Sequence, residues 1–139
     1  MYVPSIKNNL SQIASGEKFS FLKSCVICFE DAIKEEQLET AMSNITNFLK
    51  SFNQSDVKVF LRARDIQNLQ SLLELDGIDK IDGFAIAKFS TKNMKEYYNI
   101  FSHTHFYTMS VVESRDLFEI EKLKEIRDFL LTQKNILSI

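Results

Sequence analysis

Charged residues lie at the ends of four apolar segments of this 139-residue sequence, either as the last residues of the segment or directly after it. One such residue is usually a helix cap or a solvated strand end, but four charged ends with both signs of charge favour a polar site. The segments and their charged ends are 24–29 with Glu30 and Asp31, 57–63 with Arg62 and Arg64, 83–88 with Lys88, and 106–112 with Glu113.

These residue types suit the chemistry of a carbanion next to a carbonyl group. Mg²⁺ binds carboxylate oxygens, often only one or two from the protein, while water and substrate complete its shell. Arginine holds a substrate carboxylate through two parallel hydrogen bonds, a geometry that lysine cannot match. A metal beside a carbonyl stabilises an enolate, the intermediate for making or breaking a neighbouring C–C bond. Arg62, Glu113 and Asp31 together are a set that can perform this chemistry.

The two acids after segment 24–29 also have a structural interpretation. Glu30 or Asp31 can cap the helix that follows, because a carboxylate accepts hydrogen bonds from the first backbone N–H groups of a helix. The two interpretations are compatible, since one acid can cap the helix while the other faces a site.

Two cysteines, Cys25 and Cys28, have the CxxC spacing of zinc and redox motifs. Such motifs need a turn or a helix start, so that both sulfur atoms converge. Here the pair lies inside a predicted strand, where positions i and i+3 point to opposite faces. His103 and His105 lie in a loop and come with no second cysteine pair. We therefore interpret the cysteines as buried thiols.

The elements that must position the charged residues alternate along the chain. The predicted strands are 2–3, 24–29, 57–63, 83–88, 106–112 and 136–139, and the predicted helices are 6–16, 34–52, 66–75, 92–101 and 117–133. Asp65 and Thr91 are the predicted N-caps of the third and fourth helices, and Gly77 is predicted to close the third. Apolar strands joined by helices predict an α/β fold with a parallel sheet. We expect strands 24–29 to 106–112 to be adjacent in chain order, with Asp31, Arg62 and Glu113 on one rim.

Composition and charge exclude several classes of protein. Apolar residues make up 45% and charged residues 26% of the chain, as in ordinary globular proteins. A net charge of −2 disfavours a nucleic-acid partner. No apolar run approaches the roughly 20 residues of a membrane span, and no signal-peptide pattern opens the sequence, so we expect a cytoplasmic protein. Neither glycine-rich nucleotide-binding motif is present.

Five short motifs, in order and spacing, resemble one family of enzymes. They are "YVPS", "CFEDAI", "FLRAR", "FAIAKFST" and "SVVES", and together they extend over most of the chain. They resemble the citrate lyase β-subunit-like group of the HpcH/HpaI aldolase superfamily, whose stretches read like YVP, LEDAV, VRVN, PK-x-E and ALIET. The resemblance implies a (β/α)₈ TIM barrel that binds Mg²⁺ and cleaves or forms C–C bonds in oxo acids or acyl-CoA-type substrates.

The resemblance also implies roles for individual residues. Glu113 matches the metal-binding glutamate, Arg62 the substrate-binding arginine, and Asp31 the acid of the "EDA" motif near the metal and its waters. Lys88 matches the lysine after the family's proline, and we include it with Arg64 among the substrate-binding candidates. Three positions depart from the pattern: Ala87 replaces proline, Arg64 replaces asparagine and Ser90 replaces glutamate.

The length of the sequence bears on these expectations. A full barrel takes about 250 residues, whereas this sequence carries about five βα units and no counterpart of the family's second metal carboxylate. We expect residues 1–139 to form a single domain that is the N-terminal part of a barrel, and its open strand edges to promote homo-oligomers. The alternative to a magnesium-dependent lyase is an inactive half-barrel remnant or interaction module. A flavodoxin-like binding domain fits the element count, but no phosphate loop or acidic phosphoacceptor cluster follows the first strand.

Overall fold

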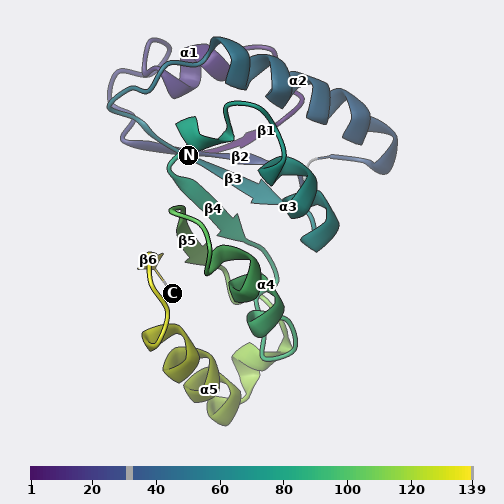
Figure 1. The fold of residues 1–139 in the computed structure, drawn as a ribbon, viewed down its shortest axis with the longest axis vertical. Helices are drawn as coiled ribbons and strands as arrows, with labels where there is room; N and C mark the ends of the chain where they lie inside the picture. The colour runs from purple at the N-terminus through teal and green to yellow at the C-terminus, as the bar shows by residue number, and fades with distance from the viewer. Residues whose placement is uncertain (31–32, 139) are drawn as a thin grey trace. The chain divides into compact units, whose positions relative to one another are not determined.

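The computed structural model describes residues 1–30 and 33–138. It contains two compact units, Met1–Gly83 and Phe84–Ile139, and each is described by itself below. Strands and helices alternate in both units (Figure 1). That the two units form a single domain stays a prediction.

The first unit carries three parallel strands at its centre. Its strands and helices are β1 (Tyr2–Pro4), α1 (Leu10–Ala14), β2 (Ser24–Cys28), α2 (Leu38–Ser51), β3 (Lys58–Ala63) and α3 (Ile66–Leu73), with 3₁₀ turns η1 (Glu35–Gln37) and η2 (Ile78–Lys80). β1 pairs with β2 and β2 with β3, so that Pro4, Cys28 and Arg62 stand in one row across the sheet. Because the pairing is parallel, the carboxyl ends of the three strands share one edge.

Burial on both faces explains why β2 and β3 are continuous apolar runs. Every residue from Cys25 to Phe29 and from Val59 to Ala63 is buried. α1 and α2 lie side by side against the sheet (Figure 1), and α2 buries one stripe of its surface. The stripe consists of Ala41, Ile45, Phe48 and Leu49, which follow the helical spacing expected from the sequence.

The second unit contains β4 (Gly83–Ile86) from its second residue on, α4 (Met94–Phe101), β5 (Tyr107–Ser110), the 3₁₀ turn η3 (Arg115–Phe118), α5 (Ile120–Leu131) and β6 (Ile136–Ser138). Its strand order is β4-β5-β6, as it is β1-β2-β3 in the first unit, and β5 pairs in parallel with β6. The Val111 N–H, directly after β5, donates at 2.9 Å to the carbonyl of Ile86, the last residue of β4. Parallel strands with helical crossovers confirm the predicted α/β fold class.

An aromatic core holds the helices of the second unit against its strands. Phe84 of β4 packs against Phe101 and Phe106, with ring centroids 5.6 and 5.2 Å apart. The Tyr98 hydroxyl of α4 lies 2.8 Å from Thr108 Oγ1 on β5, so the one polar tip of this cluster is hydrogen-bonded within the core.

The ends of α3 and α4 and the two cysteines can be compared with what the sequence predicts for them. Asp65 accepts a hydrogen bond from the Asn68 N–H, as expected of the N-cap of α3. The predicted closure of this helix by Gly77 is wrong, because α3 ends at Leu73 with Glu74 as its C-cap residue, and Gly77, with a φ of 81°, is the N-cap residue of η2. The predicted Thr91 cap is wrong, because α4 takes Asn93 as its N-cap residue. Cys25 and Cys28 are both free and buried, as predicted, and burial raises the pKa of the Cys25 thiol to about 11.

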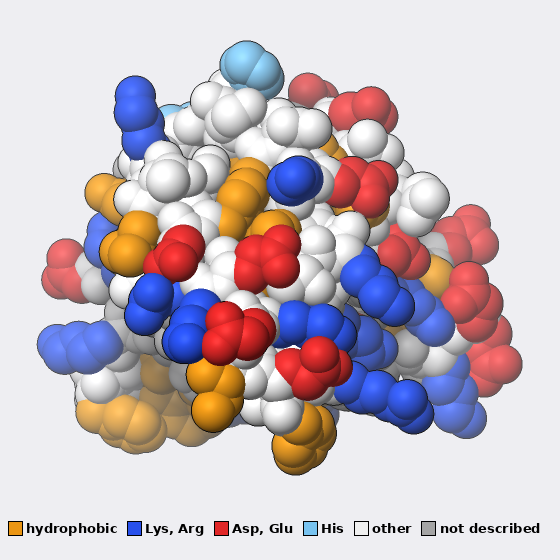
Figure 2. All heavy atoms as spheres, turned by 90° about the horizontal axis from the view of Figure 1, so that it is seen from below, with side chains coloured by type: hydrophobic (Ala, Val, Ile, Leu, Met, Phe, Trp, Pro, Cys, Tyr) orange, Lys and Arg blue, Asp and Glu red, His pale blue; other side chains and the backbone are white. Residues whose placement is uncertain are grey.

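The surface is mixed in charge. On the face drawn in Figure 2, lysine and arginine side chains lie among aspartates and glutamates, with hydrophobic side chains between them. Along α5, Lys122 pairs with Glu119 and Lys124 with Glu121. No helix in the described part of the chain is both long and apolar enough to cross a membrane.

Candidate active site

Arg62 lies at the carboxyl end of β3 in a buried ion pair. Its Nη2 is 2.5 Å from Oε2 of Glu30, and the two side chains are only 7% and 6% exposed. Its guanidinium also lies over the ring of Tyr2, 5.8 Å from the centroid, where a cation is attracted to the aromatic face. Glu30 thus positions an arginine at the strand end. It is not the cap of the following 3₁₀ turn, whose N-cap residue is Lys34.

Arg64 is two residues further along but takes different partners. Its Nη2 lies 3.0 Å from Oε2 of Glu35, and its Nη1 donates to the Ile33 carbonyl at 3.5 Å. The side chain is 31% exposed, and Glu35 is 80% exposed. Arg64 therefore contacts Ile33 and η1 near the surface, whereas Arg62 is held in a buried pair with Glu30. Asp31, the other predicted catalytic residue, lies outside the described residues.

Lys88 and Glu113 meet in the second unit. The Lys88 backbone N–H donates to Oε1 of Glu113 at 3.0 Å, and both residues are exposed. Lys88 has a φ of 49°, in the left-handed backbone region that residues other than glycine and asparagine rarely adopt. The carboxylate predicted to bind metal thus also serves as the acceptor for the loop that follows β4.

Two further side chains hold this loop, and neither was predicted to take part in the site. Asn93 Nδ2 donates to the Lys88 carbonyl at 3.0 Å, while its Oδ1 accepts from the Ser90 N–H at 2.9 Å. Asp116 accepts from the Thr91 N–H at 2.8 Å and from the Thr91 hydroxyl at 2.9 Å. The only sequence signal for Asp116 is its place three residues after Glu113, at the start of a helical segment.

Asp116 is a buried carboxylate with strong stabilising contacts. Its side chain is 6% exposed, and Oδ1 lies 3.6 Å from the Lys122 ammonium. The hydrogen bond from the Thr91 N–H, followed by the Thr91 hydroxyl and Lys122, lowers the pKa of this carboxyl group against the opposing effect of burial. Asp116 therefore ties η3 to the loop after β4 as an anion.

A hydrated magnesium ion fits the donor chemistry at one strand end. Glu113 supplies a hard carboxylate oxygen donor, and Mg²⁺ usually binds protein through one or two such groups. Among residues 1–30 and 33–138, no three histidine, cysteine, aspartate or glutamate side chains gather as a metal cluster. Arg62 lies at the end of β3 in the first unit, and Glu113 follows β5 in the second. That the two residues lie on one rim stays a prediction.

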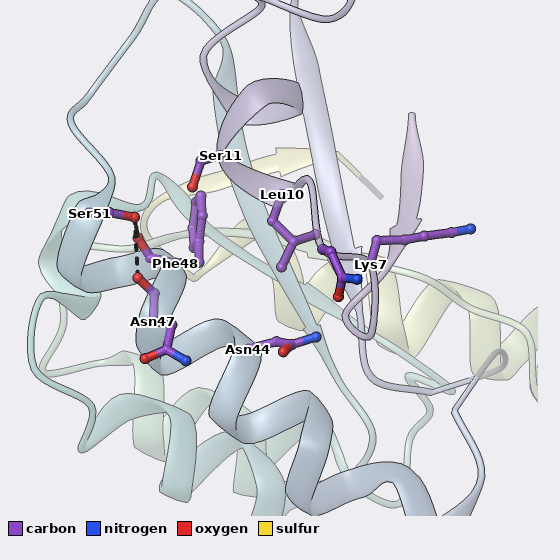
Figure 3. A pocket seen from close by; sticks show the side chains of 8 residues that line it. Lys7, Leu10, Ser11, Asn44, Asn47, Phe48 and Ser51 are labelled. Carbon is purple, nitrogen blue, oxygen red and sulfur yellow. Dashed lines mark hydrogen bonds between the residues drawn. The ribbon is translucent and has the colours of Figure 1, made fainter.

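A pocket of about 310 Å³ also opens in the first unit, between residues 7–11 and α2 (Figure 3). Its wall is mostly polar and includes Lys7, Asn44 and Asn47, beside Leu10 and Phe48. Asn44 Nδ2 donates to the Ser5 carbonyl at 3.2 Å, so this amide has a structural partner. None of the candidate site residues lines the pocket.

Parallel βα units with charged side chains where the strands end are the architecture of α/β enzymes, TIM barrels among them. The chain belongs to the family of C–C bond lyases of the TIM-barrel fold, whose family model matches residues 1–139. A comparison with curated proteins found no match. The described residues contain six strands and five α-helices, fewer than the eight βα units of a full barrel, in agreement with the predicted incomplete barrel. The resemblance read from the five motifs is therefore confirmed at the level of this lyase family.

Proposed function

We propose that the chain acts in a magnesium-dependent cleavage or formation of a C–C bond in an oxo acid or acyl-CoA-type substrate, as citrate lyase β-like enzymes of the HpcH/HpaI aldolase superfamily do. The family match over residues 1–139 is the observation that carries this proposal. The arginine and carboxylate at the strand ends support it, because they suit an anionic substrate and a hard cation. We also propose a cytoplasmic homo-oligomer with no nucleic-acid partner.

Each charged strand end has a role in this proposal. Arg62, held in place by Glu30, binds an anionic group of the substrate, and Arg64 and Lys88 contact its outer part. Glu113 is the metal ligand, and Asp31 acts beside the metal and its waters. When bound, Mg²⁺ would supply Lewis-acid chemistry at the substrate carbonyl.

A second candidate function is an inactive half-barrel or interaction module. The observation that favours it is the single carboxylate, Glu113, that the described residues place at a strand end of the second unit, with one oxygen engaged by Lys88. A module of this kind keeps the fold and needs no complete metal site.

Retro-aldol cleavage of 4-hydroxy-2-oxo acids and of 3-hydroxyacyl-CoA thioesters tests the proposal. We expect release of pyruvate or an acyl-CoA product with Mg²⁺, loss of turnover with EDTA, and a fall of at least about a hundredfold in Glu113→Gln and Arg62→Lys. Glu121→Gln and Arg127→Lys, which change exposed residues of α5, are the matched controls. Turnover that persists in Glu113→Gln and in EDTA contradicts the proposed chemistry, and no turnover of either substrate class favours the module.

A further inference from the structure

The loop after β4 is held in an unfavourable backbone conformation. Lys88, with its φ of 49°, occupies the left-handed region, where a lysine is less stable than a glycine or asparagine. Such a conformation persists only where the surrounding contacts fix it. Glu113 and Asn93 contact the Lys88 backbone, Asp116 holds Thr91 further along the loop, and the Phe89 N–H donates to the Val111 carbonyl at 3.0 Å.

Asn93 makes the central contact. It stands at the N-cap position of α4, where asparagine usually accepts a hydrogen bond from its own helix, yet its side chain makes no such bond. Its amide instead joins the Lys88 carbonyl and the Ser90 N–H. A carboxamide carries a donor and an acceptor in one plane, so it can hold both groups at once.

The contacts form a chain that ends at the candidate metal ligand. Asn93 holds the carbonyl of Lys88, and the N–H of the same residue donates to Glu113 Oε1. Asp116 fixes the next part of the loop through the N–H and hydroxyl of Thr91. The orientation of the Glu113 carboxylate therefore depends on a backbone that Asn93 and Asp116 hold.

We propose that Asn93 is a positioning residue for Glu113, acting through the Lys88 backbone, with Asp116 as the anchor of the same loop. The inference rests on the proposed function in one respect: the carboxylate that Asn93 orients is the proposed metal ligand. Carboxylates that bind metals are commonly oriented by such outer hydrogen bonds, and losing one costs about tenfold to a hundredfold in metal affinity.

Amide hydrogen exchange, followed by NMR on the chain without metal, tests the positioning. In Asn93→Ala we expect the Lys88 and Ser90 amides to exchange at least about tenfold faster, while core amides such as that of Ile27 keep their protection. Asn99→Ala, at an exposed asparagine of the same helix, should leave all of these rates unchanged. Unchanged protection of the Lys88 amide in Asn93→Ala overturns the inference.

Asn93→Asp provides a second variant if Asn93→Ala does not fold. A carboxylate keeps the acceptor for the Ser90 N–H but cannot donate to the Lys88 carbonyl. We therefore expect faster exchange at Lys88 with protection retained at Ser90. Protection retained at both amides overturns the inference in the same way.

Mn²⁺ binding, followed by electron paramagnetic resonance, connects the loop to the site. We expect Asn93→Ala to weaken Mn²⁺ binding by about tenfold or more. In a Glu113→Gln background the same substitution should leave the Mn²⁺ affinity unchanged, because both changes act on one carboxylate. An equal effect in both backgrounds contradicts action through Glu113. If Glu113→Gln leaves Mn²⁺ binding unchanged, the metal role in the proposed function fails, while the exchange rate of the Lys88 amide still decides the positioning.

Discussion

Arg62 and Arg64 illustrate how burial decides what a charged residue contributes. Both pair with a glutamate, but the Arg62–Glu30 pair is almost fully buried, and the Arg64–Glu35 pair is largely in solvent. A buried ion pair stabilises a fold little more than apolar packing does. Removing one partner is nevertheless costly in free energy, because the other charge stays buried without compensation. An exposed pair is screened by water and contributes less.

We predict that Arg62→Met lowers the free energy of unfolding by about 3 kcal/mol or more, because Glu30 loses the cation beside it in a buried position. Arg64→Met, the matched control, should cost less than about 1 kcal/mol. Urea denaturation followed by circular dichroism measures both values. Equal losses in the two variants contradict the distinction between the buried and the exposed pair.

Asp116 predicts a dependence of stability on acid pH. Its pKa in the folded chain is lowered, chiefly by the Thr91 N–H, so it stabilises the fold above the usual aspartate pKa of about 3.9. That stabilisation is lost as the pH falls from about 4 through the lower folded-state pKa. We expect Asp116→Asn to be less stable than the parent chain at pH 7, and its stability to change less between pH 5 and pH 2. Asp128→Asn, at an exposed aspartate of α5, is the matched control and should be nearly as stable as the parent chain at pH 7.

The residues at the strand ends could be predicted, whereas the contacts around them could not. Parallel strands bring their carboxyl ends to one edge, so Arg62, Lys88 and Glu113 are natural candidates from position alone. Thr91 shows the limit of this reasoning. Its sequence position fits a helix cap, yet it binds Asp116, 25 residues away in the chain. The partner of a polar loop residue depends on tertiary packing, which local sequence does not encode.

At the scale of elements, α2 receives its C-terminal cap from a distant lysine. Lys80, in η2, donates from Nζ to the Leu49 carbonyl at 2.6 Å. The last carbonyls of a helix have no partner within the helix and carry a partial negative charge, so a cation there satisfies both the hydrogen bond and the dipole. Gly77 adds to this packing, since a Cβ at that position would lie 3.3 Å from the same carbonyl oxygen.

We predict that Lys80→Met lowers the free energy of unfolding by about 1 to 2 kcal/mol, because methionine keeps the apolar stem and loses the donor. Lys50→Met is the matched control. Lys50 lies exposed in the last turn of α2, so its replacement should cost less than about 0.5 kcal/mol. Chemical denaturation measures both changes, and a loss in Lys50→Met as large as that in Lys80→Met contradicts the cap.

Strands were predicted more closely than helix ends. Apolar runs bounded by polar residues mark β2 to β5 within two residues at each boundary. Burial on both faces explains this for β2, β3 and β4. It does not for β5, where Tyr107 is exposed. The predicted helix 6–16 is shorter, at Leu10–Ala14, since Asn8 and Asn9 favour turns over helix. The predicted helix 117–133 divides at Glu119, whose extended backbone separates η3 from α5.

At the scale of the whole molecule, the first and last strands, β1 and β6, bear on association. In the part of the chain that the structure describes, β1 pairs with β2, and β6 pairs with β5. In a closed barrel the first and last strands pair with each other, which leaves no edge. Edge strands with exposed apolar side chains are templates for association. Tyr2 on β1 is 55% exposed, and Leu137 on β6 is 51% exposed.

We therefore predict that the chain self-associates in a concentration-dependent way, as measured by multi-angle light scattering. Leu137→Lys should reduce association, because a lysine on an edge strand opposes the addition of another strand. Leu131→Lys is the matched control, since Leu131 is 73% exposed on α5 and away from a strand edge. Equal effects of the two variants point to general surface hydrophobicity and against pairing at the β6 edge. A stable monomer at high concentration with cooperative unfolding contradicts association altogether, and it favours the independent module over a barrel lyase that needs further units.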